Sequence, residues 1–302
     1  MRLVSYRADD GTLRAGLVDG DSVIDLEQAG AQLGLVIGSD VGAMLAREAD
    51  GVADLGRIAA GAATAPERLP LAEVELGPVL PRPPKILLLA GNYQSHITEG
   101  GRQPVEKAAI TPRYFIKPGT AVICTGEPIR IPPVSETVDY EIEIAAVIGK
   151  RGRDIPVDQA DNFIFGYAVF NDVSARRLNN VGHRKHRAGD EWFDWLVGKW
   201  CDSFAVIGPY LVSRDEIADV TALEMALRVN GELRQHSSAG EMIFSVPEAI
   251  AWISGFITLE PGDLICMGTP GGVGATTETF LKPGDVVEAE IERLGKLVNV
   301  VR

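Results

Sequence analysis

The chain has 302 residues, and 46% of them are hydrophobic, which is enough to bury a large core. Its 29 basic and 42 acidic residues give a formal net charge of −13, which argues against DNA, RNA or an anionic membrane surface as a partner. The N-terminus lacks the apolar stretch of a signal peptide, and no apolar run is long enough to span a membrane, so we expect a soluble, cytoplasmic protein. Three cysteines lie far apart without C-x-x-C spacing, which argues against a disulfide framework or a zinc site: Cys124, Cys201 and Cys266.

Residues 1–78 are predicted to form a small α/β domain. Segments of alternating polarity up to residue 25 are separated by Asp and Gly turn residues, which predicts a β meander. Two short amphipathic helical patterns follow, and the clearer one covers residues 41–48. A cluster of prolines just before Lys85 marks the boundary with a larger domain, residues 79–302. The cluster consists of Pro78, Pro81, Pro83 and Pro84.

The larger domain is predicted to be α+β, mainly β. The apolar run KILLLAGNY, which begins at Lys85, is typical of a central strand that delivers a loop. Ser245 and Pro247 suit the first turn of a helix whose apolar stripe is formed by Ile250, Ile253, Phe256 and Ile257. Further strands are expected over residues 138–148, 165–172, 222–230, 263–267 and 286–291.

Acidic residues at alternate positions mark the segment DYEIEIAAVIGK. In one strand, Asp139, Glu141 and Glu143 would share a face, and a half-exposed strand with an acidic face toward water is the ordinary interpretation. The apolar continuation AAVIG instead indicates a buried strand, in which a cation would relieve the repulsion between carboxylates. Asp172 ends the following apolar strand and is expected to join Glu141 and Glu143. Three hard oxygen ligands predict Mg²⁺ or Mn²⁺.

His96 and Glu99 lie three residues apart after the G-N-Y loop, and one turn of helix would bring them together. A glutamate that accepts from one imidazole nitrogen makes the other nitrogen a better base, as activation of water requires. An exposed helical pair without a role is the alternative. The position of the pair at the end of a central strand favours function, and the Gly- and Pro-containing residues 100–113 are suited to a mobile lid.

From Lys85 to the C-terminus, the chain resembles the fumarylacetoacetate hydrolase family in the order and spacing of its motifs: GNYQSHITEGG, PRYFIKPGTAVICTGEPI, VDYEIEIAAVIGK, GYAVFNDVSAR, GKWCDSFAVIGP, VNGELRQ, LEPGDLICMGTPGGVG and LKPGDVVEAEIERLG. The opening residues resemble the small N-terminal domain of the longer bacterial members. The resemblance implies a catalytic domain of the mixed β-roll type, usually dimeric, so a homodimer is expected.

The resemblance also implies roles for individual residues. Glu141, Glu143 and Asp172 match the positions that hold Mg²⁺ or Mn²⁺, and His96 and Glu99 match a catalytic dyad on a lid that closes over the substrate. Three more positions match residues that hold the substrate carboxylate or support the metal: Arg176, Lys199, which we group with the catalytic residues, and Thr269. Asn179 falls where close relatives often carry glutamine, and we assign it to the substrate site.

These residues predict an enzyme that acts on a small anionic 2-oxo acid. Cleavage of the C–C bond of an acylpyruvate, such as a maleylpyruvate or fumarylpyruvate type of substrate, would release pyruvate and a carboxylic acid. The same site could serve an oxaloacetate-type decarboxylase or a 2-hydroxymuconate-type isomerase, and His96 with Glu99 favours hydrolysis. A metabolite-binding protein without catalytic activity is the alternative from another class.

Overall fold

The computed structural model describes residues 1–38, 40–62 and 68–302. Its N-terminal part is an antiparallel meander, as the turn residues predict: β1 (Arg2–Arg7), β2 (Leu13–Asp19) and β3 (Ser22–Asp25). Three helices and two short strands complete this part: α1 (Leu26–Gln32), α2 (Val41–Leu45), α3 (Glu48–Ala60), β4 (Arg68–Pro70) and β5 (Glu75–Gly77). The predicted helical segment 41–48 holds α2 and the first residue of α3.

Seven strands of the larger part form a roll: β6 (Ile86–Leu89), β7 (Tyr114–Lys117), β8 (Val122–Ile123), β10 (Ile142–Ile148), β11 (Ile164–Asp172), β13 (Ala205–Ser213) and β16 (Leu264–Cys266). The strands follow the order β13-β11-β10-β16-β6-β7. β8 comes soon after β7 in the chain and pairs with β13, so the strand path returns to its beginning. The mainly β, α+β fold expected from the sequence is confirmed.

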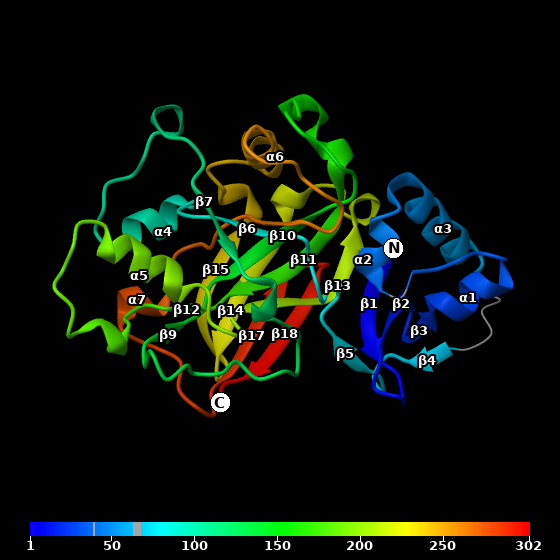
Figure 1. Ribbon diagram of the computed structural model, residues 1–302, viewed down its shortest axis with the longest axis horizontal. Coiled ribbons are helices and arrows are strands. Elements are labelled where there is room, and N and C mark those ends of the chain that lie inside the picture. Colours follow the sequence, from blue (N-terminus) through cyan, green and yellow to red (C-terminus); the bar gives the residue numbers. More distant parts are fainter. Residues whose placement is uncertain (39, 63–67) are drawn as a thin grey trace.

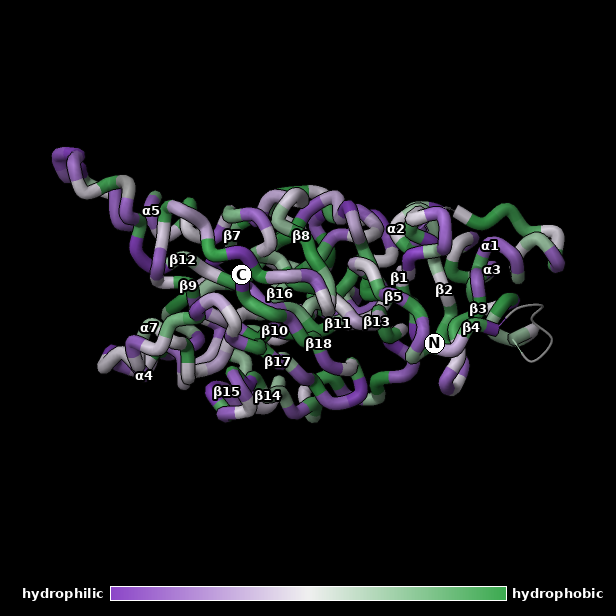
Figure 2. Tube along the Cα trace, turned by 90° about the horizontal axis from the view of Figure 1, so that it is seen from below, coloured by the Kyte–Doolittle hydropathy of each residue, from purple (hydrophilic) through white to green (hydrophobic). Residues whose placement is uncertain are grey.

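A second sheet packs against the roll and forms its own layer (Figure 2). It has the order β15-β14-β17-β18 and consists of β14 (Glu224–Val229), β15 (Glu232–Ser238), β17 (Val286–Ile291) and β18 (Gly295–Val300). The remaining elements are β9 (Val138–Asp139), β12 (Ser174–Ala175), α4 (Gln94–Glu99), α5 (Asp190–Gly198), α6 (Val246–Ser254) and α7 (Gly274–Thr277). None of these helices, nor any other in the described residues, is long and apolar enough to cross a membrane.

One sheet joins the N-terminal part to the roll. β1 pairs with β13 through Arg2 and Val212, and Figure 1 shows the N-terminal meander at one end of the molecule beside β13. The backbone hydrogen bonds of this sheet therefore cross the predicted boundary between residues 1–78 and 79–302. The division into two domains stays a prediction.

The two faces of β10 serve different layers of the core. Ile142, Ile144 and Ala146 belong to the cluster that includes Met225 and Ala289 of the second sheet. Residues at the alternate positions, Ala145 and Val147, pack inside the roll with Phe170 of β11. Since side chains alternate along a strand, Glu143 lies on this inner face, at the end of the apolar interior.

The predicted helix is α6. Ser245 caps it through the backbone N–H of Glu248, whose side chain in turn accepts from Ser245, and Ile250 and Ile253 are buried as expected. Phe256 lies beyond the last helical residue and is 57% exposed, so its predicted place in the core is wrong.

Candidate active site

Three buried carboxylates meet at one end of the roll. Glu143 comes from β10, Asp172 ends β11, and Glu141 stands in the short connection between β9 and β10. Asp172 donates its backbone N–H to the carbonyl oxygen of Glu141 at 2.8 Å, which keeps the two chains together where regular pairing stops. One carboxylate oxygen of each side chain lies within 4.8 Å of the others. The three residues predicted as metal ligands are therefore brought together.

The predicted strand over residues 138–148 is interrupted, and Asp139 does not join this cluster. β9 ends at Asp139, and β10 begins at Ile142. At the break, side chains accept the free backbone N–H groups: Asn171 Oδ1 accepts from Glu141, and Gln235 Oε1 accepts from Ile142. The interruption removes the simple alternation of faces, and Asp139 is not one of the three clustered carboxylates, although it shares Arg176 with Glu141.

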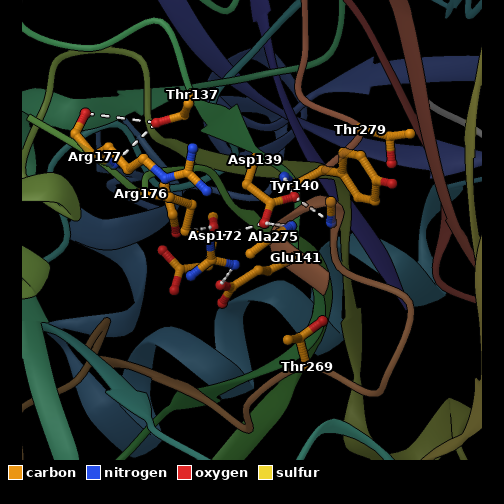
Figure 3. A network of polar contacts seen from close by, with 12 residues as sticks. Thr137, Asp139, Tyr140, Glu141, Asp172, Arg176, Arg177, Thr269, Ala275 and Thr279 are labelled. Atoms are coloured by element: carbon orange, nitrogen blue, oxygen red, sulfur yellow. Dashed lines mark hydrogen bonds and ion pairs between the residues drawn. The ribbon is translucent and has the colours of Figure 1, made fainter. Parts of the chain in front are cut away.

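Asp139 instead binds the start of α7 and an arginine (Figure 3). Its oxygens accept the backbone N–H groups of Gly274 at 2.7 Å and Ala275 at 2.9 Å, and Arg176 Nε lies 2.8 Å from Oδ2. Arg176 Nη2 also donates to Glu141 Oε1. Asp139 therefore holds the arginine that pairs with a carboxylate of the cluster.

Two buried lysines contact the cluster. Lys199 follows α5, and its Nζ lies 2.9 Å from Glu141 Oε2 and 2.6 Å from Asp172 Oδ2. Lys117, at the end of β7, lies 2.7 Å from Asp172 Oδ1 and donates to the carbonyl oxygens of Val173 and Phe204 at 2.8 Å each. Lys117 was not among the site residues predicted from the sequence. Its signal is the alternation in YFIK, which places a lysine on the same side of the strand as the buried Phe115.

The carboxyl groups of the cluster have pKa values shifted in opposite directions. Burial works to raise the pKa of Glu141, but Lys199 and Arg176 hold that pKa well below its usual range. Burial raises the pKa of Glu143 well above the ordinary value, and the negative charges of Asp172 and Glu141 raise it further. A carboxyl group that resists ionisation among oxygen donors is the expected state of a site built for a divalent cation, so this donor set fits a hard metal ion.

His96 and Glu99 meet on α4, as the spacing predicts. Nδ1 of His96 lies 2.5 Å from Glu99 Oε1, and the other oxygen of Glu99 accepts the backbone N–H of Gly272 at 2.6 Å. Because an ionised carboxylate only accepts, Nδ1 carries the proton and Nε2 keeps its lone pair. A protonated His96 would also lower the pKa of Glu141, which indicates that the imidazole lies near the cluster.

The loop after β16 connects the dyad and the carboxylates. Gly268 donates its backbone N–H to Glu143 Oε2 at 2.9 Å, and the next residue, Thr269, is 3% exposed. Gln235, a second residue missed among the candidates although it ends the motif VNGELRQ, donates to Thr269 Oγ1 at 2.8 Å. Asn179 is exposed and its backbone N–H donates to Val134, so its contact with substrate stays a prediction.

Comparisons with known proteins agree with this geometry. The family model for the fumarylacetoacetate (FAA) hydrolase C-terminal region matches residues 85–302. The mitochondrial oxaloacetate tautomerase FAHD2B of Bos taurus is 40% identical over 253 residues, which are 83% of this chain and 77% of the relative.

Several solved structures match this chain over its whole length, among them two named enzymes. Maleylpyruvate hydrolase from Sphingobium sp. SYK-6, in complex with manganese(II) and pyruvate, has 29% identity, a TM-score of 0.77 and 98% of its own chain covered. Fumarylacetoacetate hydrolase from Exiguobacterium antarcticum has 30% identity, a TM-score of 0.81 and 99% of its chain covered. Together with the buried acidic metal site, these matches establish that the chain belongs to the fumarylacetoacetate hydrolase family of metal-dependent enzymes.

Proposed function

We propose that the protein is an acylpyruvate hydrolase that uses Mg²⁺ or Mn²⁺, held by Glu141, Glu143 and Asp172, to release pyruvate and a carboxylic acid. The observation that carries the proposal is the polarised dyad. Glu99 binds both His96 Nδ1 and the amide of Gly272, so the imidazole is fixed in the tautomer that leaves Nε2 as a base. A fixed base next to a metal site is suited to taking a proton from water that attacks the acyl carbon.

The basic residues of the site suit an anionic 2-oxo acid. A divalent cation would supply Lewis-acid stabilisation of the enolate charge that develops as the C–C bond breaks. Arg176 and Lys199 both contact Glu141 and so orient one ligand of the metal. Thr269, next to the Gly268 amide that binds Glu143, is assigned to the substrate carboxylate, and Asn179 to the more variable acyl part.

We further propose that the enzyme works as a homodimer.

A second candidate is a keto–enol tautomerase of oxaloacetate. It is favoured by the 40% identity with relatives that are oxaloacetate tautomerases. In that reaction, the same base would move a proton between carbon and oxygen, so a C–H bond is exchanged for an O–H bond and no C–C bond is cleaved. The dyad serves both reactions, so the products must separate them.

The test is an incubation of the purified protein with Mn²⁺ and, in parallel, with Mg²⁺. The substrates are maleylpyruvate, fumarylpyruvate and oxaloacetate. Pyruvate is measured together with the co-product, and the enol absorbance of oxaloacetate is followed in the same buffer. A chelator provides the metal-free control.

Pyruvate and maleate or fumarate in equal amounts, formed only with metal, would support the hydrolase. Accelerated loss of enol oxaloacetate without pyruvate would instead establish the tautomerase, and pyruvate with carbon dioxide a decarboxylase. No metal-dependent turnover of any substrate would overturn the proposal.

A further inference from the structure

Gln235 is a buried amide whose orientation is fixed by two backbone groups. It lies on β15 with 1% of its surface exposed. Its Oε1 accepts the backbone N–H of Ile142 at 3.0 Å, and its Nε2 donates to the carbonyl oxygen of Pro270 at 2.9 Å. A backbone N–H only donates and a carbonyl oxygen only accepts, so a flipped amide would lose both bonds.

The fixed amide determines whether the Thr269 hydroxyl accepts or donates in the hydrogen bond between them. The second proton of Gln235 Nε2 points to Thr269 Oγ1, 2.8 Å away, so the hydroxyl oxygen must accept there. A hydroxyl group has one proton, and this proton must then find another acceptor. Among the hydrogen bonds of the described residues, the Thr269 hydroxyl serves only as an acceptor, so its proton is not used within the protein.

Thr269 lies in a loop that contacts both the carboxylate cluster and the dyad. The loop of residues 268–272 is bound to the carboxylate cluster at one end and to the dyad at the other. Gly268 donates to the metal-ligand candidate Glu143, and Gly272 donates to Glu99. Figure 3 shows Thr269 below Glu141 of the carboxylate cluster. A hydroxyl proton here can be donated to an anionic ligand between the cluster and the dyad.

The geometry points to Gln235 as a positioning residue that keeps the Thr269 hydroxyl available as a donor to the carboxylate of the bound 2-oxo acid. Gln235 contacts the backbone of Ile142 and Pro270 and the hydroxyl of Thr269, and we assign its effect on the ligand to Thr269. The role rests on the proposed function, because it requires a carboxylate ligand at the site. A charged acceptor makes this hydrogen bond stronger than one between neutral groups.

The experiment is a double-mutant cycle read out by binding. Oxalate, which offers the vicinal oxygens of a 2-oxo acid, is titrated calorimetrically into the Mn²⁺-loaded protein. We expect Gln235→Met and Thr269→Val each to weaken oxalate binding by about tenfold, the effect of losing one charge-assisted hydrogen bond. The double variant should bind no more weakly than either single variant, because both remove the same interaction.

A further variant reverses the direction of the hydrogen bond between residue 235 and Thr269. Gln235→Glu keeps an acceptor for Ile142 but presents another acceptor to Thr269, which would turn the hydroxyl proton away from the ligand. Its oxalate affinity should fall at least as far as that of Gln235→Met. Ser95→Ala is the matched control, because Ser95 Oγ accepts from Gly271 of the same loop at 3.2 Å without touching Thr269. Thermal unfolding and Mn²⁺ affinity of each variant verify that fold and metal site persist.

Additive losses in the double variant would overturn the inference, as would full oxalate affinity in either Gln235 variant. An equal loss in Ser95→Ala would also overturn it, because the effect would then come from general disturbance of the loop. Failure of the wild-type protein to bind oxalate with Mn²⁺ would contradict the proposed function itself, and this result is separate from any difference among variants.

Discussion

At the scale of single residues, His96 is distinguished from the other histidines by its fixed partner. His96→Ala should lower kcat by about 10²- to 10⁴-fold, the usual contribution of a general base, because His96 is the one side chain that Glu99 binds in the part of the chain that the structure describes. Mn²⁺ affinity should change little, since the metal-ligand candidates are carboxylates. Steady-state kinetics and calorimetry measure the two quantities.

The control for this substitution is His236→Ala. His236 also faces a glutamate, Glu224 at 3.4 Å, but it is exposed on the second sheet. It should retain wild-type kcat. Full turnover by His96→Ala would rule out the dyad as the base.

Glu143 gives the metal site a defined pH dependence. Its pKa in the metal-free protein is raised by burial and by the charges of Asp172 and Glu141, so it retains its proton at a pH where an ordinary carboxyl group is ionised. A cation must displace that proton. We therefore expect Mn²⁺ binding to release a proton and Mn²⁺ affinity to rise with pH until the raised pKa is passed.

Calorimetric titrations in buffers of different ionisation enthalpy measure the released proton. The sign for folding is opposite: the folded metal-free protein binds this proton more tightly than the unfolded chain, so this group's contribution to stability falls as pH rises above the ordinary carboxyl range. Glu143→Gln, which has no proton to release, is the control. Metal affinity that is independent of pH in the wild type would contradict the assignment of Glu143.

At the scale of elements, the loop of residues 268–272 depends on Gly272. This residue has φ +104°, and a Cβ there would lie 2.1 Å from the carbonyl oxygen of Arg234. Gly272→Ala should therefore displace the loop, remove the amide that binds Glu99, and cost several kcal/mol of folding stability. Chemical denaturation and kcat measure the two effects.

Gly56→Ala is the matched glycine control. Gly56 is exposed in α3, and a Cβ there meets no atom within 4 Å. The substitution should stabilise the protein by about 0.5–1 kcal/mol, because alanine favours a helix over glycine. Unchanged stability and activity in Gly272→Ala would contradict the role given to this loop.

Patterns that depend on local chemistry could be predicted from the sequence. Turn residues predicted the β1–β3 meander, and Ser245 predicted the capped start of α6. Alternation of apolar residues predicted the strands and led to Glu141, Glu143 and Asp172. These features are visible because each depends on neighbours in the chain.

Features set by distant partners could not be predicted. The break at Tyr140 and Glu141 exists because Asn171 and Gln235 supply acceptors from other strands. Lys117 on β7 reaches Asp172 on β11, a strand far from it in the chain. Phe256 continued a helical stripe in sequence, but the helix ends at Ser254. In each case, long-range geometry overrides the local pattern.

At the scale of the whole molecule, an acidic protein has to capture an anion. The site supplies three buried or nearly buried cations, Lys117, Lys199 and Arg176, against four carboxylates, which include Asp139. A proton on Glu143 balances these charges in the metal-free site. A divalent cation with Glu143 ionised would leave the site with one net positive charge, which matches a 2-oxo acid anion within a chain of net charge −13.

The exposed aromatic face of α5 leads to the prediction on assembly. Trp192, 50% exposed, lines a cavity of about 480 Å³ together with Trp252 and Phe256, among others. The next residue on α5, Phe193, is 62% exposed. Contiguous apolar surface of this kind marks an interface, and we expect it to lie between the subunits of the proposed homodimer.

Phe193→Asp should therefore shift the protein toward monomers in size-exclusion chromatography with light scattering. Val36→Asp, at an 86% exposed position in the N-terminal part, should not. A wild-type monomer, or a dimer that both variants preserve, would contradict this interface.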